Sequence, residues 1–197
     1  LGHVETSSRH LLSLINDLLD LSKIEAGGLD LELQPLIVDD IIQASMHFVK
    51  EVAHKKNIEL SSQNDQPHAI VVADARRLKQ MLVNLLGNAV KFTSEGGRVQ
   101  LQVTPDAAAQ EIRFIVSDTG VGIPPEAQAK LFQPFTQLDS ALARQHEGTG
   151  LGLALVKRLA AQHGGSVSVF SSGVPGEGSC FTLVLPYNTD TDFTLAQ

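Results

Sequence analysis

The sequence is poor in cysteine, in positive charge and in long hydrophobic runs. A single cysteine, Cys180, excludes an intrachain disulfide and a four-thiolate metal site. Lys and Arg number 15 against 22 Asp and Glu, a net charge of −7, and no basic cluster is dense enough to follow a phosphate backbone. We therefore expect no nucleic-acid partner. No apolar run approaches the ~20 residues that cross a bilayer, so we also expect no membrane contact within this sequence.

Enough apolar residues are present to form a folded domain. Of the 197 residues, 43% are hydrophobic and 19% are charged, without low-complexity runs, which is typical of a globular protein. A prior of about 150 residues per domain predicts one full domain with a smaller appendage. The sequence begins at Leu1 inside a helical pattern, so we interpret it as part of a longer protein.

The appendage is expected to be a bundle helix over about residues 3–25. Its apolar residues fall on two adjacent stripes, a width suited to packing against several helices: Leu11, Leu14, Leu18 and Leu21, with Leu12, Ile15 and Leu19. The helical pattern stops at Ala26, Gly27 and Gly28, a helix-ending signal. Alternating leucines then favour a short edge strand or an extended linker, and we assign residues 28–37 to a linker.

Helices and short strands alternate irregularly after this linker. Asp74 is expected to cap the start of a long helix. Helices are predicted over about 38–56, 74–92 and 151–163, with a short one after Pro124. Strands are predicted near 58–61, 69–73, 99–103, 111–117, 167–170 and 181–185. Such a mostly antiparallel arrangement favours an α+β fold, with a main domain at 38–187 and a polar tail at 188–197.

The helix expected over 74–92 carries the first chemical signal. Apolar residues occupy one face, and Asn84, Asn88 and Lys91 recur at i, i+4 and i+7 on the other. An amide oxygen is a ligand suited to Mg²⁺, and a neighbouring lysine can meet phosphate charge. Taken alone, the pattern is more often a solvated helix face.

Two glycine-rich turns strengthen this signal. Asp118 ends a predicted strand and precedes Gly120 and Gly122, so a buried carboxylate there could accept a hydrogen bond from an exocyclic amine such as that of adenine. An ordinary Asp-Thr-Gly turn is the alternative. Residues 148–152 form a second turn before a helix, whose N-terminal amides can hold phosphate. This turn lacks the third glycine of a dinucleotide fingerprint, and the sequence contains no Gly-Lys pair for a Walker A motif.

Four motifs, in this order, resemble the N, G1, F and G2 boxes of sensor histidine kinases. They are Asn84-x-x-x-Asn88-x-x-Lys91-Phe92-Thr93, Asp118-x-Gly120-x-Gly122, Phe132-x-x-Phe135 and Gly148-x-Gly150-x-Gly152. Residues 14–27 resemble the second helix of that family's dimerisation and phosphotransfer domain, so the resemblance spans about 5–186. We assign residues 1–27 to a part of that domain. It implies a two-layer α/β sandwich of the GHKL (Bergerat) ATP-binding type with an N-terminal bundle helix.

The resemblance implies a role for each matched residue. Asp118 would bind the adenine amine, Asn88 would ligate Mg²⁺ with Asn84 in support, and Lys91 would contact phosphate. Arg144 is a candidate contact to the γ-phosphate, which makes Lys91 and Arg144 the catalytic candidates. The other expected ATP-binding residues shape the purine pocket or the ends of a mobile lid: Gly120, Gly122, Ile123, Phe132, Phe135, Gly148, Thr149, Gly150, Leu151 and Gly152.

Two departures from the family pattern qualify the resemblance. Glu147 stands where the family often has glycine, which puts a carboxylate near the expected phosphates. The His-Glu-Leu-Arg-Thr-Pro-like segment that carries the phosphoacceptor is absent, and His3 and His10 lack its context. The phosphoacceptor histidine is therefore expected outside these residues.

The resemblance implies the ATP-binding catalytic portion of a protein histidine kinase. That portion would be cytoplasmic and homodimeric through the helical bundle, and the phosphoryl group would pass onward to the aspartate of a response-regulator receiver domain. One alternative is a nucleotide-binding pseudokinase that serves dimerisation and regulator docking, which Glu147 favours. Another is a different GHKL ATPase, against which the lack of any glutamate between Asp74 and Thr93 argues.

Overall fold

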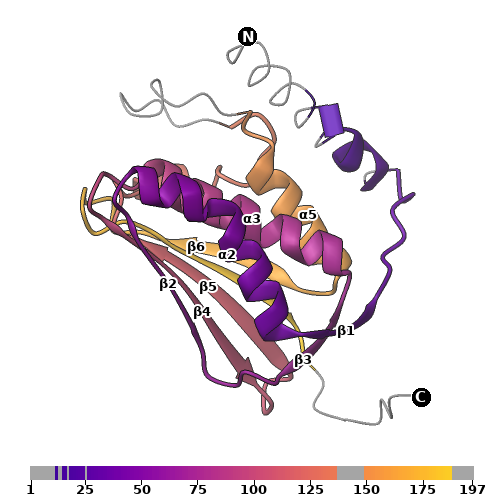
Figure 1. Cartoon of the computed structure of the whole chain (residues 1–197). Helices are drawn as coiled ribbons and strands as arrows, with labels where there is room; N and C mark the ends of the chain where they lie inside the picture. The colour runs from indigo at the N-terminus through magenta and orange to yellow at the C-terminus, as the bar shows by residue number, and fades with distance from the viewer. Residues whose placement is uncertain (1–11, 13–14, 17, 25, 137–148, 188–197) are drawn as a thin grey trace.

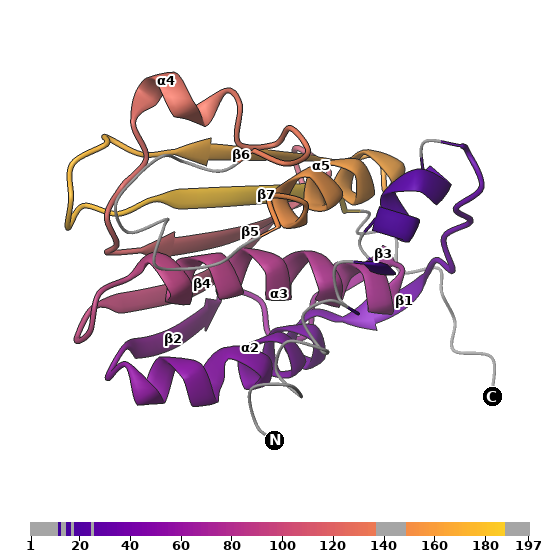
Figure 2. The same cartoon turned by 90° about the horizontal axis from the view of Figure 1, so that it is seen from above.

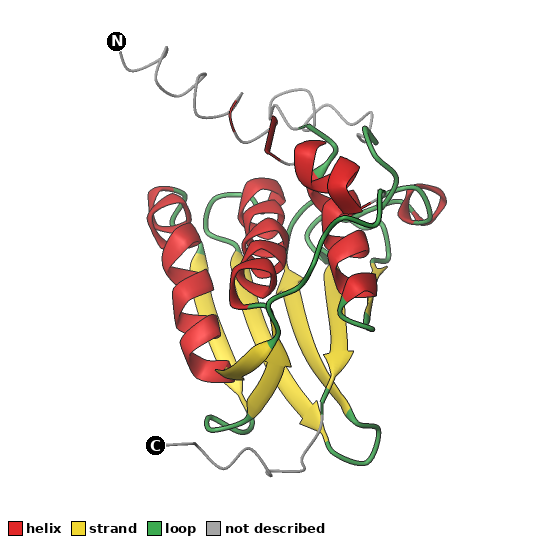
Figure 3. Ribbon diagram, turned by 90° about the vertical axis from the view of Figure 1, so that its right-hand side faces the viewer, coloured by secondary structure: helices red, strands yellow, loops and turns green. Residues whose placement is uncertain are grey.

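Three helices lie side by side across one face of a five-stranded sheet (Figures 1 and 3). They are α2 (Val38–Lys55), α3 (Ala75–Phe92) and α5 (Gly152–Gln162), and a single turn, α4 (Pro125–Gln128), precedes α5. This computed structural model describes residues 12, 15–16, 18–24, 26–136 and 149–187. Within those residues, no helix combines the length and the hydrophobicity needed to cross a bilayer.

The main sheet is mixed, in the order β2-β4-β5-β7-β6. Its strands are β2 (Glu59–Asn64), β4 (Arg98–Asp106), β5 (Glu111–Asp118), β6 (Ser166–Phe170) and β7 (Cys180–Pro186). Only the β2–β4 pair is parallel. The two-layer α/β sandwich expected from the sequence is confirmed, because one sheet face packs against the helices and the strand residues on that face are buried.

A small second sheet begins in the segment for which the sequence left an edge strand and an extended linker open. The alternating residues Leu29, Leu31 and Leu33 form no strand; the strand β1 begins later, at Gln34–Ile37, and pairs antiparallel with β3 (Ile70–Ala73). The register explains the shift. It sets Leu36, which is partly buried, opposite Val71, which is 1% exposed, so β1 gains the backbone partner that the leucines upstream lack.

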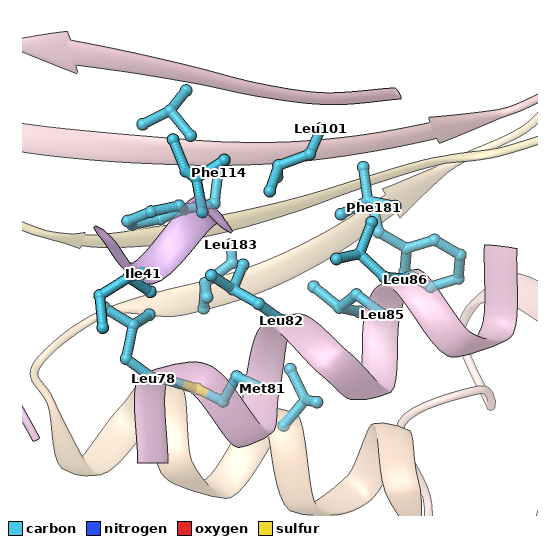
Figure 4. Packing of buried hydrophobic residues seen from close by; sticks show 14 of the residues in the cluster. Ile41, Leu78, Met81, Leu82, Leu85, Leu86, Leu101, Phe114, Phe181 and Leu183 are labelled. Carbon is cyan, nitrogen blue, oxygen red and sulfur yellow. The ribbon is translucent and has the colours of Figure 1, made fainter. Parts of the chain in front are cut away.

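Helix α3 is the centre of the core. Asp74 caps it as predicted, since its carboxylate accepts a hydrogen bond from the backbone N–H of Arg77 at 3.0 Å. One face is apolar and meets side chains from the sheet (Figure 4). The α3 residues in this packing are Leu78, Met81, Leu82, Leu85 and Leu86, and the strand residues include Leu101, Phe114, Phe181 and Leu183. Because this apolar face is buried, the orientation of the opposite face of α3, which carries the polar candidate residues, is fixed as well.

The described part of the N-terminal helix is attached to the start of α3 (Figures 1 and 2). Arg77, whose side chain is 4% exposed, forms an ion pair with Asp20. Its Nη2 lies 2.9 Å from Oδ1 of Asp20, Nη1 bonds the other carboxylate oxygen, and Gln80 donates to that oxygen as well. Leu21 and Ile24 are each 6% exposed. A buried, bidentate ion pair therefore joins this helix to the domain.

We predict that Asp20→Asn lowers the free energy of unfolding by about 1–3 kcal/mol at pH 7, because it leaves the buried Arg77 without its charged acceptor. Burial acts to raise the pKa of Asp20, but hydrogen bonds from Arg77 and Gln80 outweigh it and lower that pKa. The stabilisation is therefore present above the ordinary carboxyl pKa of about 3.9 and is lost as the pH falls through the lower folded value.

Urea unfolding followed by circular dichroism at several pH values between 7 and 2.5 measures this effect. The difference in the free energy of unfolding between wild type and Asp20→Asn should become smaller below about pH 4. Glu51→Gln is the matched control, since Glu51 pairs only with Lys55 at the surface, where the side chains are 80% and 70% exposed. Equal stability of Asp20→Asn and wild type at pH 7 would contradict the prediction.

Candidate functional site

Asp118 lies at the end of β5 and is 8% exposed. Its Oδ1 accepts hydrogen bonds from the backbone N–H groups of Gly120 (2.8 Å) and Ser179 (3.3 Å), and its Oδ2 accepts one from the Ser179 hydroxyl (2.6 Å). Burial raises the pKa of Asp118, against the hydrogen bonds from Ser179 and Gly120, which lower it. The carboxylate is thus oriented rigidly, and Oδ2, with one protein donor, keeps capacity to accept another.

The loop after Asp118 folds tightly against the end of α3. A Cβ on Gly120 would lie 2.5 Å from the carbonyl oxygen of Phe92, so only glycine fits there without displacing the backbone. Gly122 has φ +73°, and a Cβ there would lie 3.0 Å from the carbonyl oxygen of Val174. Ile123 is 9% exposed and belongs to the hydrophobic core. The glycines that the sequence assigned to a purine pocket therefore bring three segments together around Asp118.

Two serines in this region were missed by sequence reasoning. Ser179, the residue before β7, supplies two of the three hydrogen bonds to Asp118. Ser171 is 6% exposed; its hydroxyl donates to the Gly178 carbonyl at 2.6 Å and accepts from the Ile123 N–H at 2.9 Å. A Cβ on Gly178 would lie 1.8 Å from the Asp118 carbonyl oxygen. The glycine-rich run before β7 was the available signal, because such runs permit close backbone approach.

The polar face of α3 meets the start of α5. A Cβ on Gly152, the first residue of α5, would lie 3.4 Å from Oδ1 of Asn84. The Nδ2 of Asn84 is buried and has no hydrogen-bond partner within the described residues. Asn88 is half-buried one turn further along α3. An unsatisfied donor beside a helix N-terminus fits an anionic group such as phosphate, because both attract negative charge.

Lys91 is half-buried near the end of the same face. Its Nζ lies 4.9 Å from the centroid of the Phe92 ring, and burial lowers the pKa of Lys91. A positive charge held at this position adds to the anion-attracting character of the polar face.

The two ends of the segment between the F and G2 boxes are joined by their backbones. Phe132 packs edge-on against Phe181, with ring centroids 6.4 Å apart, and contacts the core. Phe135 is 68% exposed and has φ +61°, and its expected role as a lid anchor stays a prediction. Its backbone N–H donates to the Gly150 carbonyl at 3.0 Å. Phe132 is thus the aromatic residue with a buried contact.

The second glycine-rich turn leads directly into α5. The Thr149 hydroxyl accepts a hydrogen bond from the Leu151 N–H at 3.1 Å, and Leu151 is 3% exposed. Gly150 has φ +69°, which favours glycine. Arg144, Glu147 and Gly148 lie outside the described residues, so their expected roles stay predictions.

Comparison with known proteins identifies the family and the fold. Residues 73–189 match the histidine kinase-, DNA gyrase B-, and HSP90-like ATPase family. The chain is 44% identical over 188 residues to the circadian input-output histidine kinase CikA of Synechococcus elongatus. This match covers 94% of this chain and 24% of CikA. It is also 44% identical over 189 residues to the sensor protein GacS of Pseudomonas syringae pv. syringae. This match covers 94% of this chain and 20% of GacS.

A solved structure of full-length ShkA in complex with AMPPNP is 37% identical to the chain, with a TM-score of 0.82 over 95% of this chain and 38% of that one. The chain belongs to the histidine kinase-, DNA gyrase B- and HSP90-like ATPase family. Within it, the chain is the ATP-binding catalytic domain of the sensor histidine kinases, as the four motifs implied. It spans only 20% to 34% of the length of the first curated relatives that it matches.

Proposed function

We propose that this chain is the catalytic portion of a protein histidine kinase, which positions ATP for transfer of its γ-phosphoryl group to a histidine outside these 197 residues. The observation that carries the proposal is that α3 touches both candidate ends of a nucleotide site: the loop after Asp118 packs against its Phe92 carbonyl, and the start of α5 packs against its Asn84 side chain. The buried carboxylate of Asp118 lies beyond one end of α3, and the unsatisfied amide of Asn84 lies beside the start of α5. A carboxylate can accept a hydrogen bond from the nucleobase, and an amide can donate one to a phosphate oxygen, so the two groups suit the two ends of a nucleotide.

The adenine end of the site is assigned to Asp118. Its Oδ2 would accept a hydrogen bond from the exocyclic amine, while Ser179 and Gly120 hold the carboxylate in orientation. Gly122 and Ile123 would form the wall of the purine pocket. This arrangement gives selectivity for adenine because guanine presents an acceptor, not a donor, at the equivalent ring position.

The phosphate end is assigned to α3 and to the start of α5. Asn84 and the amides near Gly152 would bind phosphate oxygens, and Lys91 would neutralise part of their charge. Asn88 would ligate Mg²⁺ through its amide oxygen, since this hard cation prefers oxygen ligands. When bound, the metal supplies charge neutralisation at the phosphates. Arg144 and Gly148 keep their proposed contacts with the γ-phosphate and the lid end.

The catalytic contribution of these residues is positioning and electrostatic stabilisation. Phosphoryl transfer asks for little covalent chemistry from the enzyme. Lys91 and Arg144 would hold positive charge where negative charge is spread in the transition state, and the rigid core contact of α3 would keep that charge in place. A general base on α3 is not needed for this role.

We further propose a homodimer, a receiver-domain partner and a cytoplasmic location for this portion. The described part of the N-terminal helix exposes four apolar side chains by 46% to 61%, which favours coverage by a second protomer in a helical bundle. These residues are Leu12, Ile15, Leu18 and Leu19. The aspartate of a response-regulator receiver domain would accept the phosphoryl group from the histidine.

We predict that Asp118→Asn weakens Mg·ATP binding by about 1–3 kcal/mol. Two backbone N–H groups bond Oδ1, so the amide oxygen of asparagine must take that place and the NH₂ group must take the place of Oδ2. The variant then presents a donor to the adenine amine. Calorimetric titration with ATP and GTP should show a fall in the preference for ATP, and an unchanged preference would mean that Asp118 does not contact the base.

We predict that Asn88→Ala weakens ATP binding by about tenfold in magnesium and much less in EDTA, because only the metal-bound complex uses the amide oxygen. Asn88→Asp is the matched control, since it keeps an oxygen ligand and should keep the response to magnesium. Equal losses in both buffers would point to a folding defect instead of a lost metal ligand.

The transfer step itself is tested with radiolabelled ATP. The 197-residue chain alone should remain unlabelled, whereas adding a polypeptide that supplies the first bundle helix with its phosphoacceptor histidine should label that polypeptide. Acid-labile phosphate on His3 or His10 of the chain alone would contradict the proposed location of the acceptor. Weak ATP binding without labelling of the added polypeptide would favour the pseudokinase alternative.

A further inference from the structure

The end of α3 leaves four carbonyl oxygens that the helix itself cannot satisfy, as every helix does. The last intrahelical bond is made at Ala89, whose carbonyl accepts from both the N–H (3.0 Å) and the hydroxyl (2.7 Å) of Thr93. The carbonyl of Phe92 accepts from the N–H of Val121 at 3.3 Å, in the loop that follows Asp118. Three carbonyls therefore need partners from elsewhere in the chain.

All three accept hydrogen bonds from one side chain. The Nζ of Lys56, the C-cap residue that follows α2, lies 2.8 Å from the carbonyl oxygen of Val90, 3.0 Å from that of Lys91 and 2.6 Å from that of Thr93. An ammonium group has three N–H donors, so Lys56 uses its full capacity here. It also places a positive charge at the negative end of the α3 dipole.

We infer that Lys56 is a positioning residue for nucleotide binding, a role that rests on the ATP binding proposed above. The segment 90–93, in which three carbonyl groups accept from Lys56, connects both ends of the site. It carries Lys91, the proposed phosphate contact, and its Phe92 carbonyl holds the loop in which Gly120 donates to Asp118. Gly120 packs closely against that carbonyl group, since a Cβ on Gly120 would lie 2.5 Å from its oxygen. A shift of the end of α3 would therefore displace the loop.

The charge of Lys56 is held at a cost, which argues for a purpose beyond surface solubility. Burial lowers the pKa of Lys56, whereas Lys55, one residue earlier, is 70% exposed and, within the described part of the chain, forms an ion pair with Glu51 alone. Three backbone carbonyls replace the water that the ammonium loses. Arginine would keep the charge, but its planar guanidinium cannot direct three donors to three converging oxygens in the same way.

The test is a calorimetric titration of the 197-residue chain with Mg·ATP at a temperature where circular dichroism shows every variant folded. Lys56→Met, which keeps the length of the side chain but removes its donors, should bind about tenfold more weakly than wild type. Lys55→Met is the matched control and should bind as wild type does. Lys56→Arg should restore part of the affinity through its charge.

Amide hydrogen exchange separates positioning from general destabilisation. In Lys56→Met the N–H of Val121 should lose protection, while the N–H of Phe114, in the centre of the sheet, should keep it. Uniform loss of protection, or Mg·ATP affinity equal to wild type, would overturn the inference. Failure of wild type to bind Mg·ATP would instead refute the proposed function. If Lys56→Met does not fold, an affinity of Lys56→Arg equal to wild type with unchanged exchange at Val121 would overturn the inference.

Discussion

The packing of α3 is the constraint on which the other parts of the structure depend. One face of this helix is fully committed to the core, where Leu78, Leu82 and Leu85 have no exposed surface. The rotation of the helix about its axis is therefore fixed, because turning it would bury amides and expose leucines. The position of Asn84 and Asn88 follows directly from that packing. Asp74 and Arg77 fix the beginning of α3, and Lys56 and Val121 fix its end.

Much of the fold was predictable from local patterns. The period of apolar residues located α2, α3 and α5 to within a few residues, and Asp74 was recognised as a cap because its chemistry is local. The place of the strand β1, within the segment that we left open between an edge strand and an extended linker, could not be predicted for the opposite reason. Its strand character comes from pairing with Ile70–Ala73, which lies more than thirty residues away, and alternation of leucines carries no information about such a partner.

The candidate site likewise contains residues that sequence motifs could identify and residues that they could not. Asp118, the glycines near it and the amides of α3 were identified because motifs place them within short stretches of sequence. Ser179 and Ser171 were missed, since each acts through a contact with a residue 61 or 48 positions away. Lys56 carries no motif at all, and its role arises only where the end of α2 meets the end of α3. Hydrogen bonds of this kind depend on the assembled fold.

The unsatisfied Nδ2 of Asn84 has a consequence for how this domain responds to heat. The Nδ2 of Asn84 is buried and has no partner within the described residues, and a donor left in that state costs about 1–3 kcal/mol. A ligand that accepts from this amide removes the penalty, and its binding adds to the stability of the folded state by mass action. The domain thus gives up part of its melting temperature at the place where a nucleotide would restore it.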